Sequence, residues 1–216
     1  MTNYSQGREQ SVILAVFGPK IGTFLDIGAY HPTELSNTRA LIERGWRGTL
    51  IEPNPYSFEI IRKARVGGGG PQTYAECERL NLVLAAVDID RKILKMHGSE
   101  SPMTTACDSV RDRWKQSTPY WGDFFIPTVT IEDVCKQFGP FDMISIDCEG
   151  MSFDVAKHLP LDARHTKLIC IEHDGRLIEL GEHMQEFGYV QKWIGQENAI
   201  YVLEEAKKPE KEKDDA

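Results

Sequence analysis

The stretch TFLDIGAYHP, residues 23–32, decides the fold, because it begins as a buried strand and breaks into a turn at Gly28. The mostly apolar run before the glycine is typical of a strand inside a parallel sheet. Glycine adopts backbone angles that are closed to other residues, and it lets a ligand approach the main chain. The stretch therefore predicts a strand whose carboxyl end faces a bound molecule.

Apolar runs of strand length recur along the chain. Seven are expected to be strands, namely 23–28, 48–52, 80–87, 141–147, 167–172, 189–194 and 199–203. The segments with helical spacing are 36–46, 56–65, 105–114, 130–138, 153–159 and 177–187. Thr130 lies three residues before Asp133, which is the spacing of a capping box at a helix start.

The order of these segments predicts the architecture. Strand and helix alternate over the first five strands, which indicates a parallel sheet with helices on both faces. Only GQEN, residues 195–198, separates the last two strands, and so short a link implies an antiparallel hairpin. We therefore expect an α/β protein whose doubly wound, seven-stranded, mostly parallel sheet ends in a C-terminal antiparallel hairpin.

Length and composition indicate one globular domain. The chain has 216 residues, of which 41% are hydrophobic and 27% charged, and we expect a single domain over residues 1–206. The charged segment 207–216 cannot pack and is expected to be a disordered tail. The formal net charge of -8 argues against nucleic acid and anionic membranes as partners, because both bind basic surfaces.

Nothing in the sequence indicates export. The apolar run VILAVF near the N-terminus is too short for a signal peptide or a membrane span. The five cysteines form no C-x-x-C pair, so neither a disulfide framework nor a zinc site is indicated. We therefore expect a cytoplasmic protein with reduced thiols.

Acidic residues mark the carboxyl ends of the predicted strands, where a doubly wound sheet binds its ligands. The strand ends are Asp26-Ile27-Gly28, Glu52-Pro53-Asn54, Asp88, Asp147-Cys148-Glu149 and Glu172-His173-Asp174. Glu52 lies 26 positions after Asp26, where a carboxylate can accept both hydroxyls of a ribose. Taken alone, Asp26 and Gly28 are equally consistent with a structural turn. The series of acidic ends favours a nucleoside site.

The nucleoside cofactor that suits these strand ends is S-adenosylmethionine (SAM). A dinucleotide site needs G-x-G-x-x-G for its pyrophosphate, whereas residues 28–33 read GAYHPT and keep only the first glycine. SAM has no phosphate, and its sulfonium and ammonium groups are cations, which acidic side chains attract. We therefore expect SAM rather than a dinucleotide.

Several short motifs of the sequence resemble those of the FkbM family of class I SAM-dependent methyltransferases, which have a Rossmann-like fold. These motifs are GTFLDIGAYHP, SNT, IEPNP, TIEDV and ISIDCEG. The resemblance implies a methionine end lined by Asp26, Gly28, Ala29 and Tyr30, with Ser36 and Asn37 beside it. It implies the remaining cofactor contacts for Glu52, Pro53 and Asn54 at the ribose, Ala85, Ala86, Val87 and Asp88 at the adenine, and Asp147 and Glu149 near the sulfonium.

The resemblance also implies the reaction, which is methylation of a hydroxyl on a sugar or on a small glycosylated or polyketide-like metabolite. Such a transfer requires a positioned acceptor and removal of the hydroxyl proton. His173 is our first candidate for the base, and His31 is the second. Asp147 and Glu149 could instead share a cation or divide the acid and base roles. Structural roles, as a packed histidine or a turn cap, are the alternatives for all four residues.

Two other functions fit the same strand ends. Asp147, Glu172 and Asp174 offer hard oxygen ligands to Mg²⁺, which would make the O-methyltransferase metal dependent. A SAM-binding or nucleoside-binding module without catalysis is the other alternative, and a methyl-transfer assay separates it from both enzymes.

The connection over residues 89–140 is too long for a simple crossover. It is rich in aromatic residues, which would suit a lid over a sugar ring and would equally pack an insert against the body of the protein. These residues are Trp114, Tyr120, Trp121, Phe124 and Phe125.

Overall fold

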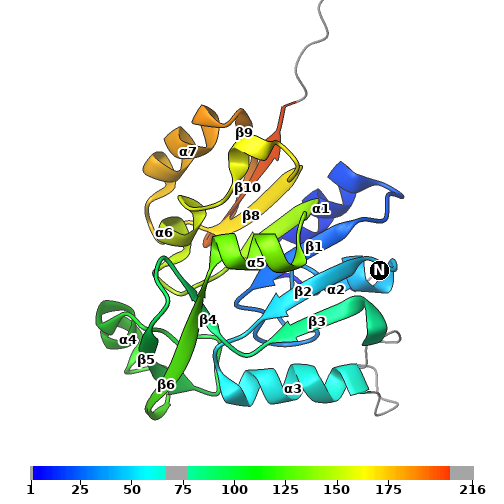
Figure 1. The fold of residues 1–216 in the computed structure, drawn as a ribbon. Helices are drawn as coiled ribbons and strands as arrows, with labels where there is room; N and C mark the ends of the chain where they lie inside the picture. The colour runs from blue at the N-terminus through cyan, green and yellow to red at the C-terminus, as the bar shows by residue number, and fades with distance from the viewer. Residues whose placement is uncertain (1, 67–76, 205–216) are drawn as a thin grey trace, which may run out of the picture.

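The computed structural model, which describes residues 2–66 and 77–204, has a seven-stranded sheet at its centre (Figure 1). The strand order is β3-β2-β1-β7-β8-β10-β9. The parallel strands are β1 (Thr23–Ile27), β2 (Arg47–Ile51), β3 (Leu80–Val83), β7 (Met143–Ile146) and β8 (Leu168–Glu172). β10 (Asn198–Leu203) runs antiparallel to β8 and to β9 (Tyr189–Ile194). This arrangement confirms the expected fold class, including the C-terminal hairpin.

Helices cover both faces of this sheet, because alternate strand residues point to opposite sides. In β1, Phe24 belongs to one buried cluster and Leu25 to the other. The Phe24 cluster includes residues of α1 (Glu9–Phe17), α2 (Arg39–Glu43) and α3 (Pro55–Val66). The Leu25 cluster includes residues of α5 (Ile131–Phe138), α6 (Ser152–Ala156) and α7 (Leu177–Glu186). The nearly continuous apolar runs of the sequence thus reflect strands that are buried on both sides.

A second sheet follows β3, and the sequence-based expectation of one strand over 80–87 is wrong. β3 pairs with β2 only from Leu80 to Val83, because β2 ends at Ile51 and offers no partner further on. The run then continues as β4 (Ala86–Asp88), which pairs with β6 (Tyr120–Thr130). β5 (Ile93–Ser99) completes this sheet antiparallel to β6. The long connection is therefore an insert with its own sheet.

The insert also carries α4 (Asp108–Trp114), within the segment expected to be helical. Figure 1 shows α4, β5 and β6 together at one end of the molecule, beyond β4. β6 leads directly into α5, where the side-chain oxygen of Thr130 accepts a hydrogen bond from the Asp133 backbone nitrogen at 3.2 Å. This contact confirms the predicted helix cap.

In the part of the chain that the structure describes, two short 3-10 helices and four free thiols complete the fold. Short 3-10 helices, η1 (Cys77–Arg79) and η2 (Leu161–Ala163), precede β3 and β8. Cys107, Cys135, Cys148 and Cys170 are free thiols. Within residues 2–66 and 77–204, every helix is too short or too polar to cross a lipid bilayer. The tail expected over 207–216 lies outside the described residues.

Candidate active site

The point where the chain order reverses in the sheet lies between β1 and β7. From β1 the chain moves outward to β2 and β3, whereas β7 and β8 lie on the other side of β1. A ligand crevice forms at such a switch point. Gly28, just after β1, has a φ of +79°, and a Cβ added there would lie 1.8 Å from the backbone oxygen of Asp147. Only glycine fits this close approach of the two loops, which explains the glycine in the DIG motif of the sequence.

Two cavities lie at this point, and they share part of their lining. Gly28, Tyr30, Pro102, Asp147 and Glu149 line both of them. The empty space at the first cavity, open solvent included, is about 680 Å³, and that at the second is about 870 Å³. The two cavities therefore meet at a common wall.

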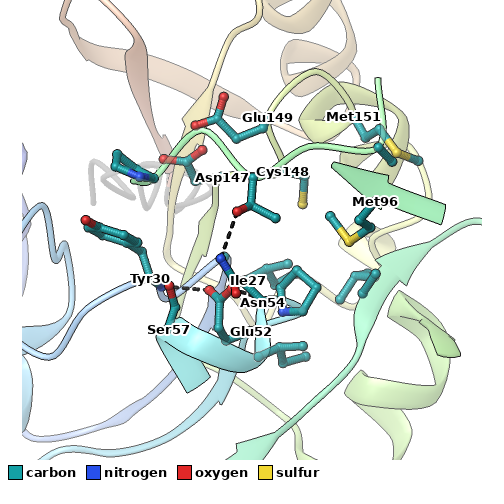
Figure 2. A pocket seen from close by; sticks show the side chains of 18 of the residues that line it. Ile27, Tyr30, Glu52, Asn54, Ser57, Met96, Asp147, Cys148, Glu149 and Met151 are labelled. Atoms are coloured by element: carbon teal, nitrogen blue, oxygen red, sulfur yellow. Dashed lines mark hydrogen bonds between the residues drawn. The ribbon is translucent and has the colours of Figure 1, made fainter. Parts of the chain in front are cut away.

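The first cavity is apolar on the side of the insert and polar on the side of β2 (Figure 2). Its apolar lining consists mainly of Ala85, Ala86, Val87, Leu94, Met96, Ala106 and Met151. Glu52, Pro53, Asn54 and Ser57 line the side of β2 and α3. A lining that combines apolar side chains with a buried carboxylate is suited to a nucleoside.

Glu52 is buried at the end of β2 and is fixed by the backbone. One carboxylate oxygen accepts from the Tyr30 nitrogen at 2.8 Å, and the other accepts from the Asn54 nitrogen at 2.8 Å. Burial raises the pKa of Glu52 to about 7, although the two backbone hydrogen bonds work in the opposite direction. Each oxygen keeps a lone pair for a further donor. This geometry leaves Glu52 able to accept hydrogen bonds from a vicinal diol.

Asn54 joins the body of the protein to the insert. Its side-chain nitrogen donates to the Ser99 backbone oxygen at 2.6 Å and to the Thr104 hydroxyl oxygen at 2.8 Å. Its side-chain oxygen accepts from the Tyr56 nitrogen at 3.0 Å. Asn54 therefore helps to fix the insert against the first cavity, in addition to lining it.

The second cavity has an acidic side and a side formed by the insert. Its acidic lining residues are Asp147, Glu149, Glu172, Asp174 and Glu197. Glu172 accepts hydrogen bonds from the Glu149 nitrogen and from the Ser152 hydroxyl, each at 3.1 Å. The insert contributes Met103 and, from α4, Val110, Arg113 and Trp114. This cavity combines hydrogen-bond acceptors with an indole ring and a guanidinium group.

Burial and mutual repulsion raise the pKa values of the carboxyl groups around the second cavity. Burial is the main cause, and repulsion by neighbouring carboxylates adds to it, so that the pKa of Glu149 rises to about 9 and that of Glu172 to about 11. Burial also raises the pKa of Asp147, to about 6. At neutral pH, Asp147 is therefore mainly ionised, whereas Glu149 and Glu172 keep their protons until a cation approaches.

Backbone strain is concentrated around the second cavity. Tyr30, Leu35, Glu149 and Asp174 all have φ values between 46° and 56° and all line it. Among the non-glycine residues that the structure describes, only Arg164 shares this left-handed conformation elsewhere. Such conformations cost free energy and persist mainly at functional sites. The strain therefore supports a functional role for this cavity, independently of its charge.

Comparison with known families agrees with this geometry, because residues 26–201 match the methyltransferase FkbM domain. The chain belongs to the FkbM methyltransferase family. The match extends from Asp26 in β1 to Tyr201 in β10, so it includes the whole insert and all residues that line the two cavities except Gln6. It confirms the expected family and the expected enzyme class, a methyltransferase. Among curated proteins, no match is found.

This chain is similar to several solved structures at low sequence identity, and the first of those named here has the same fold. An FkbM methyltransferase from Methylobacillus flagellatus KT is 12% identical, with a TM-score of 0.53, and the alignment covers 84% of this chain. This chain spans only 43% of that protein. A precorrin-6y C5,15-methyltransferase from Geobacter metallireducens GS-15 is 14% identical over 95% of this chain and 93% of its own, with a TM-score of 0.48. An O-methyltransferase from Bacillus cereus in complex with SAH is 14% identical over 94% of this chain and 83% of its own, with a TM-score of 0.45.

The FkbM-like cofactor residues expected from the sequence fall into two groups. Those that line one or both cavities are Gly28, Tyr30, Asn37, Glu52, Pro53, Asn54, Ala85, Ala86, Val87, Asp147 and Glu149. Asp26, Ala29, Ser36 and Asp88 line neither cavity. Asp26 is buried and accepts a hydrogen bond from the Thr38 hydroxyl at 2.5 Å, so it supports the start of α2. Asp88 accepts from the nitrogens of Ile89 and Asp90 and forms an ion pair with Lys92.

The two candidate histidines of this FkbM protein also line neither cavity. The ring nitrogen Nδ1 of His173 accepts from the Gly175 nitrogen at 3.2 Å, and its backbone nitrogen donates to the Glu197 oxygen. The Nδ1 atom of His31 accepts from the Glu34 nitrogen at 3.0 Å. Both rings are thus engaged in local turns, and their catalytic roles stay predictions.

Several side chains that line the two cavities were not predicted from the sequence. Glu197 lies in the hairpin link GQEN, where its acidic character, close in sequence to a strand end, was the available signal. Arg113 and Met96 belong to the insert, whose strands were not predicted. Of the aromatic residues considered for a lid, Trp114 lines the second cavity, whereas Phe125 is 68% exposed.

Proposed function

We propose that the chain transfers the methyl group of SAM to a hydroxyl oxygen of a small acceptor, of the sugar, glycosylated or polyketide-like kind that the family resemblance suggests. The observation that carries this proposal is the wall common to the two cavities, to which Gly28, Tyr30, Asp147 and Glu149 contribute. A donor in the first cavity and an acceptor in the second meet at this wall, as direct transfer requires.

The residues of the first cavity fit SAM, which supplies an activated methyl group on a cationic sulfur when bound. Ala86, Val87 and Met96 offer apolar contacts to an adenine, and Glu52 offers lone pairs to the ribose hydroxyls. The side-chain oxygen of Asn37 is buried without a hydrogen-bond partner among the described residues, and Asn37 lines the second cavity. This oxygen would accept from the ammonium group of SAM if the methionine end reaches past the common wall into the second cavity.

In this proposal, Asp147 removes the proton from the acceptor hydroxyl. It lines both cavities, and its pKa of about 6 leaves it mainly ionised at neutral pH. Glu149, with a pKa of about 9, stays protonated and donates a hydrogen bond to the same region. Two carboxyl groups with separated pKa values commonly divide base and acid roles. His173 is the competing base, because sequence reasoning placed it first.

Binding and turnover test this function directly. We expect calorimetry to show that the protein binds SAM and SAH but not NAD. We also expect release of SAH when SAM is mixed with a panel of sugars, glycosides and polyketide-like alcohols, one of which acts as the acceptor. Binding of NAD in place of SAM would contradict the cofactor assignment. Binding of SAM without turnover on any acceptor would favour the non-catalytic module.

A metal-dependent O-methyltransferase is the second candidate, and one observation favours it. Carboxylate oxygens of Asp147, Glu149 and Glu172 lie within 4.8 Å of one another, a spacing that one divalent ion can bridge. This set has Glu149 where sequence reasoning proposed Asp174. A bound Mg²⁺ would acidify an acceptor hydroxyl. Turnover that disappears with EDTA and returns with Mg²⁺ would favour this candidate, and turnover that survives EDTA would remove it.

A further inference from the structure

His97, in β5, is buried between two carboxylates of the insert. Its Nδ1 lies 2.6 Å from an oxygen of Asp123 in β6, and its Nε2 lies 2.9 Å from an oxygen of Asp108 in α4. The His97 side chain is 2% exposed, whereas those of Asp108 and Asp123 are 71% and 48% exposed. One imidazole therefore joins all three elements, α4, β5 and β6.

His97 is the centre of a network of charged side chains. The hydrogen bond from His97 lowers the pKa of Asp123 in β6. Lys95 lies 3.3 Å from Asp123, and Arg111 lies 2.9 Å from Asp108 and 3.4 Å from Nε2 of the ring. The ring therefore contacts two side chains of α4, Asp108 and Arg111, and one of β6.

The position of His97 links it to both cavities. Its backbone exchanges hydrogen bonds with Thr105, which lies in the loop that joins β5 to α4. Thr104 and Ala106, on either side of Thr105, line the first cavity. Arg113 and Trp114, at the end of α4, line the second. The part of the insert that His97 holds therefore forms walls of both cavities.

We propose that His97 is a positioning residue for methyl transfer: its ring ties α4 to β5 and β6 and so holds the insert side of both cavities. The assignment of SAM and acceptor to these cavities rests on the proposed function, whereas the tie itself does not. His97 touches neither ligand in this proposal and acts through the residues on α4 and the preceding loop.

The first test measures the order of α4. Hydrogen exchange of residues 108–114 should become at least about 10-fold faster in His97→Gln, because a charge-assisted contact that holds the helix is lost. Exchange in β1 and β7 should stay unchanged. Unchanged exchange in α4 would overturn the proposal.

The second test measures ligand affinity. His97→Gln should weaken SAM binding by about 3- to 10-fold, because Ala106 and Thr104 lose a fixed position. The control is His158→Gln, which removes an exposed histidine outside both cavities and should change nothing.

A third variant keeps the proposal testable if His97→Gln does not fold. Asp108→Ala removes only the exposed partner on α4 and should reproduce both the faster exchange and the weaker SAM binding. Faster exchange in α4 with unaltered SAM affinity would overturn the link to the cavities. If the wild type binds no SAM, the proposed function fails, while the exchange results still decide whether His97 ties down α4.

Discussion

Glu52 carries cofactor recognition in the proposed function, because its buried carboxylate is the polar group aimed at a ribose. Glu52→Ala should weaken SAM binding by on the order of 1–3 kcal/mol, or about 5- to 150-fold, since two charge-assisted hydrogen bonds to the diol are lost. Titration calorimetry measures this loss. Asp88→Asn is the matched control, because Asp88 is an equally buried strand-end carboxylate that lines neither cavity. Unchanged SAM affinity in Glu52→Ala would sink the assignment.

Asp147 and His173 compete for the role of base, and two substitutions separate them. Asp147→Asn should keep SAM binding within about tenfold and lower kcat by roughly 10² to 10⁴, because general bases typically contribute that much. His173→Ala should keep most of its turnover, because the ring lies outside both cavities. Steady-state kinetics with the identified acceptor measure both. The reverse pattern would return the role to His173, as sequence reasoning first placed it.

The strand ends in the sequence predict residues whose role depends on their backbone position. They do not predict residues whose role depends on side-chain contacts. Gly28 and Glu52 follow strands directly, so their place at the crevice was visible in the sequence. Asp26 also ends a strand, but its carboxylate accepts from Thr38, 12 residues further on. Glu197 reaches the acidic wall from a hairpin. Such orientations depend on contacts distant in sequence.

At the level of elements, the main sheet was predictable and the insert was not. The central strands β1, β7 and β8 are buried along almost their whole length, so their sequences are mostly continuous apolar runs. β5 and β6 are partly exposed and include glycine and charged residues, and β6 also includes proline, so their sequences do not show a clear strand pattern. The apolar run 80–87 looked like one strand, because pattern alone does not reveal where a neighbouring strand ends.

The close approach of Gly28, after β1, to the backbone of Asp147, after β7, gives a prediction at this scale. Gly28→Ala should lower the free energy of unfolding by at least about 2 kcal/mol, because a left-handed φ and a clash with a backbone oxygen act together. Gly18→Ala is the control: its φ is also positive, at +56°, but its Cβ would meet nothing within 4 Å. It should cost about 1 kcal/mol. If urea unfolding shows that both substitutions lower the free energy of unfolding equally, the close approach at Gly28 has no special role.

At the level of the whole molecule, the acidic side of the site makes stability depend on pH in an unusual direction. Burial raises the pKa of Asp147 from 3.8 to about 6, of Glu52 from 4.5 to about 7 and of Glu149 from 4.5 to about 9. The folded state therefore binds more protons than the unfolded chain between these limits. The contribution of these groups to the free energy of unfolding is fully present below their ordinary pKa values. It is lost as pH rises through the raised pKa values.

Thermal unfolding without ligand should accordingly show a lower midpoint at about pH 8.5 than at about pH 5. Carboxyl groups with lowered pKa values, such as Asp133 at about 2, are already ionised at both pH values and do not offset this trend. Glu149→Gln should unfold at a higher temperature than the wild type at pH 8.5, with little difference at pH 5, because it removes one group that must lose its buried proton. A midpoint that rises with pH, or one that Glu149→Gln leaves unchanged at pH 8.5, would show that these carboxyl groups are not crowded as the structure has them.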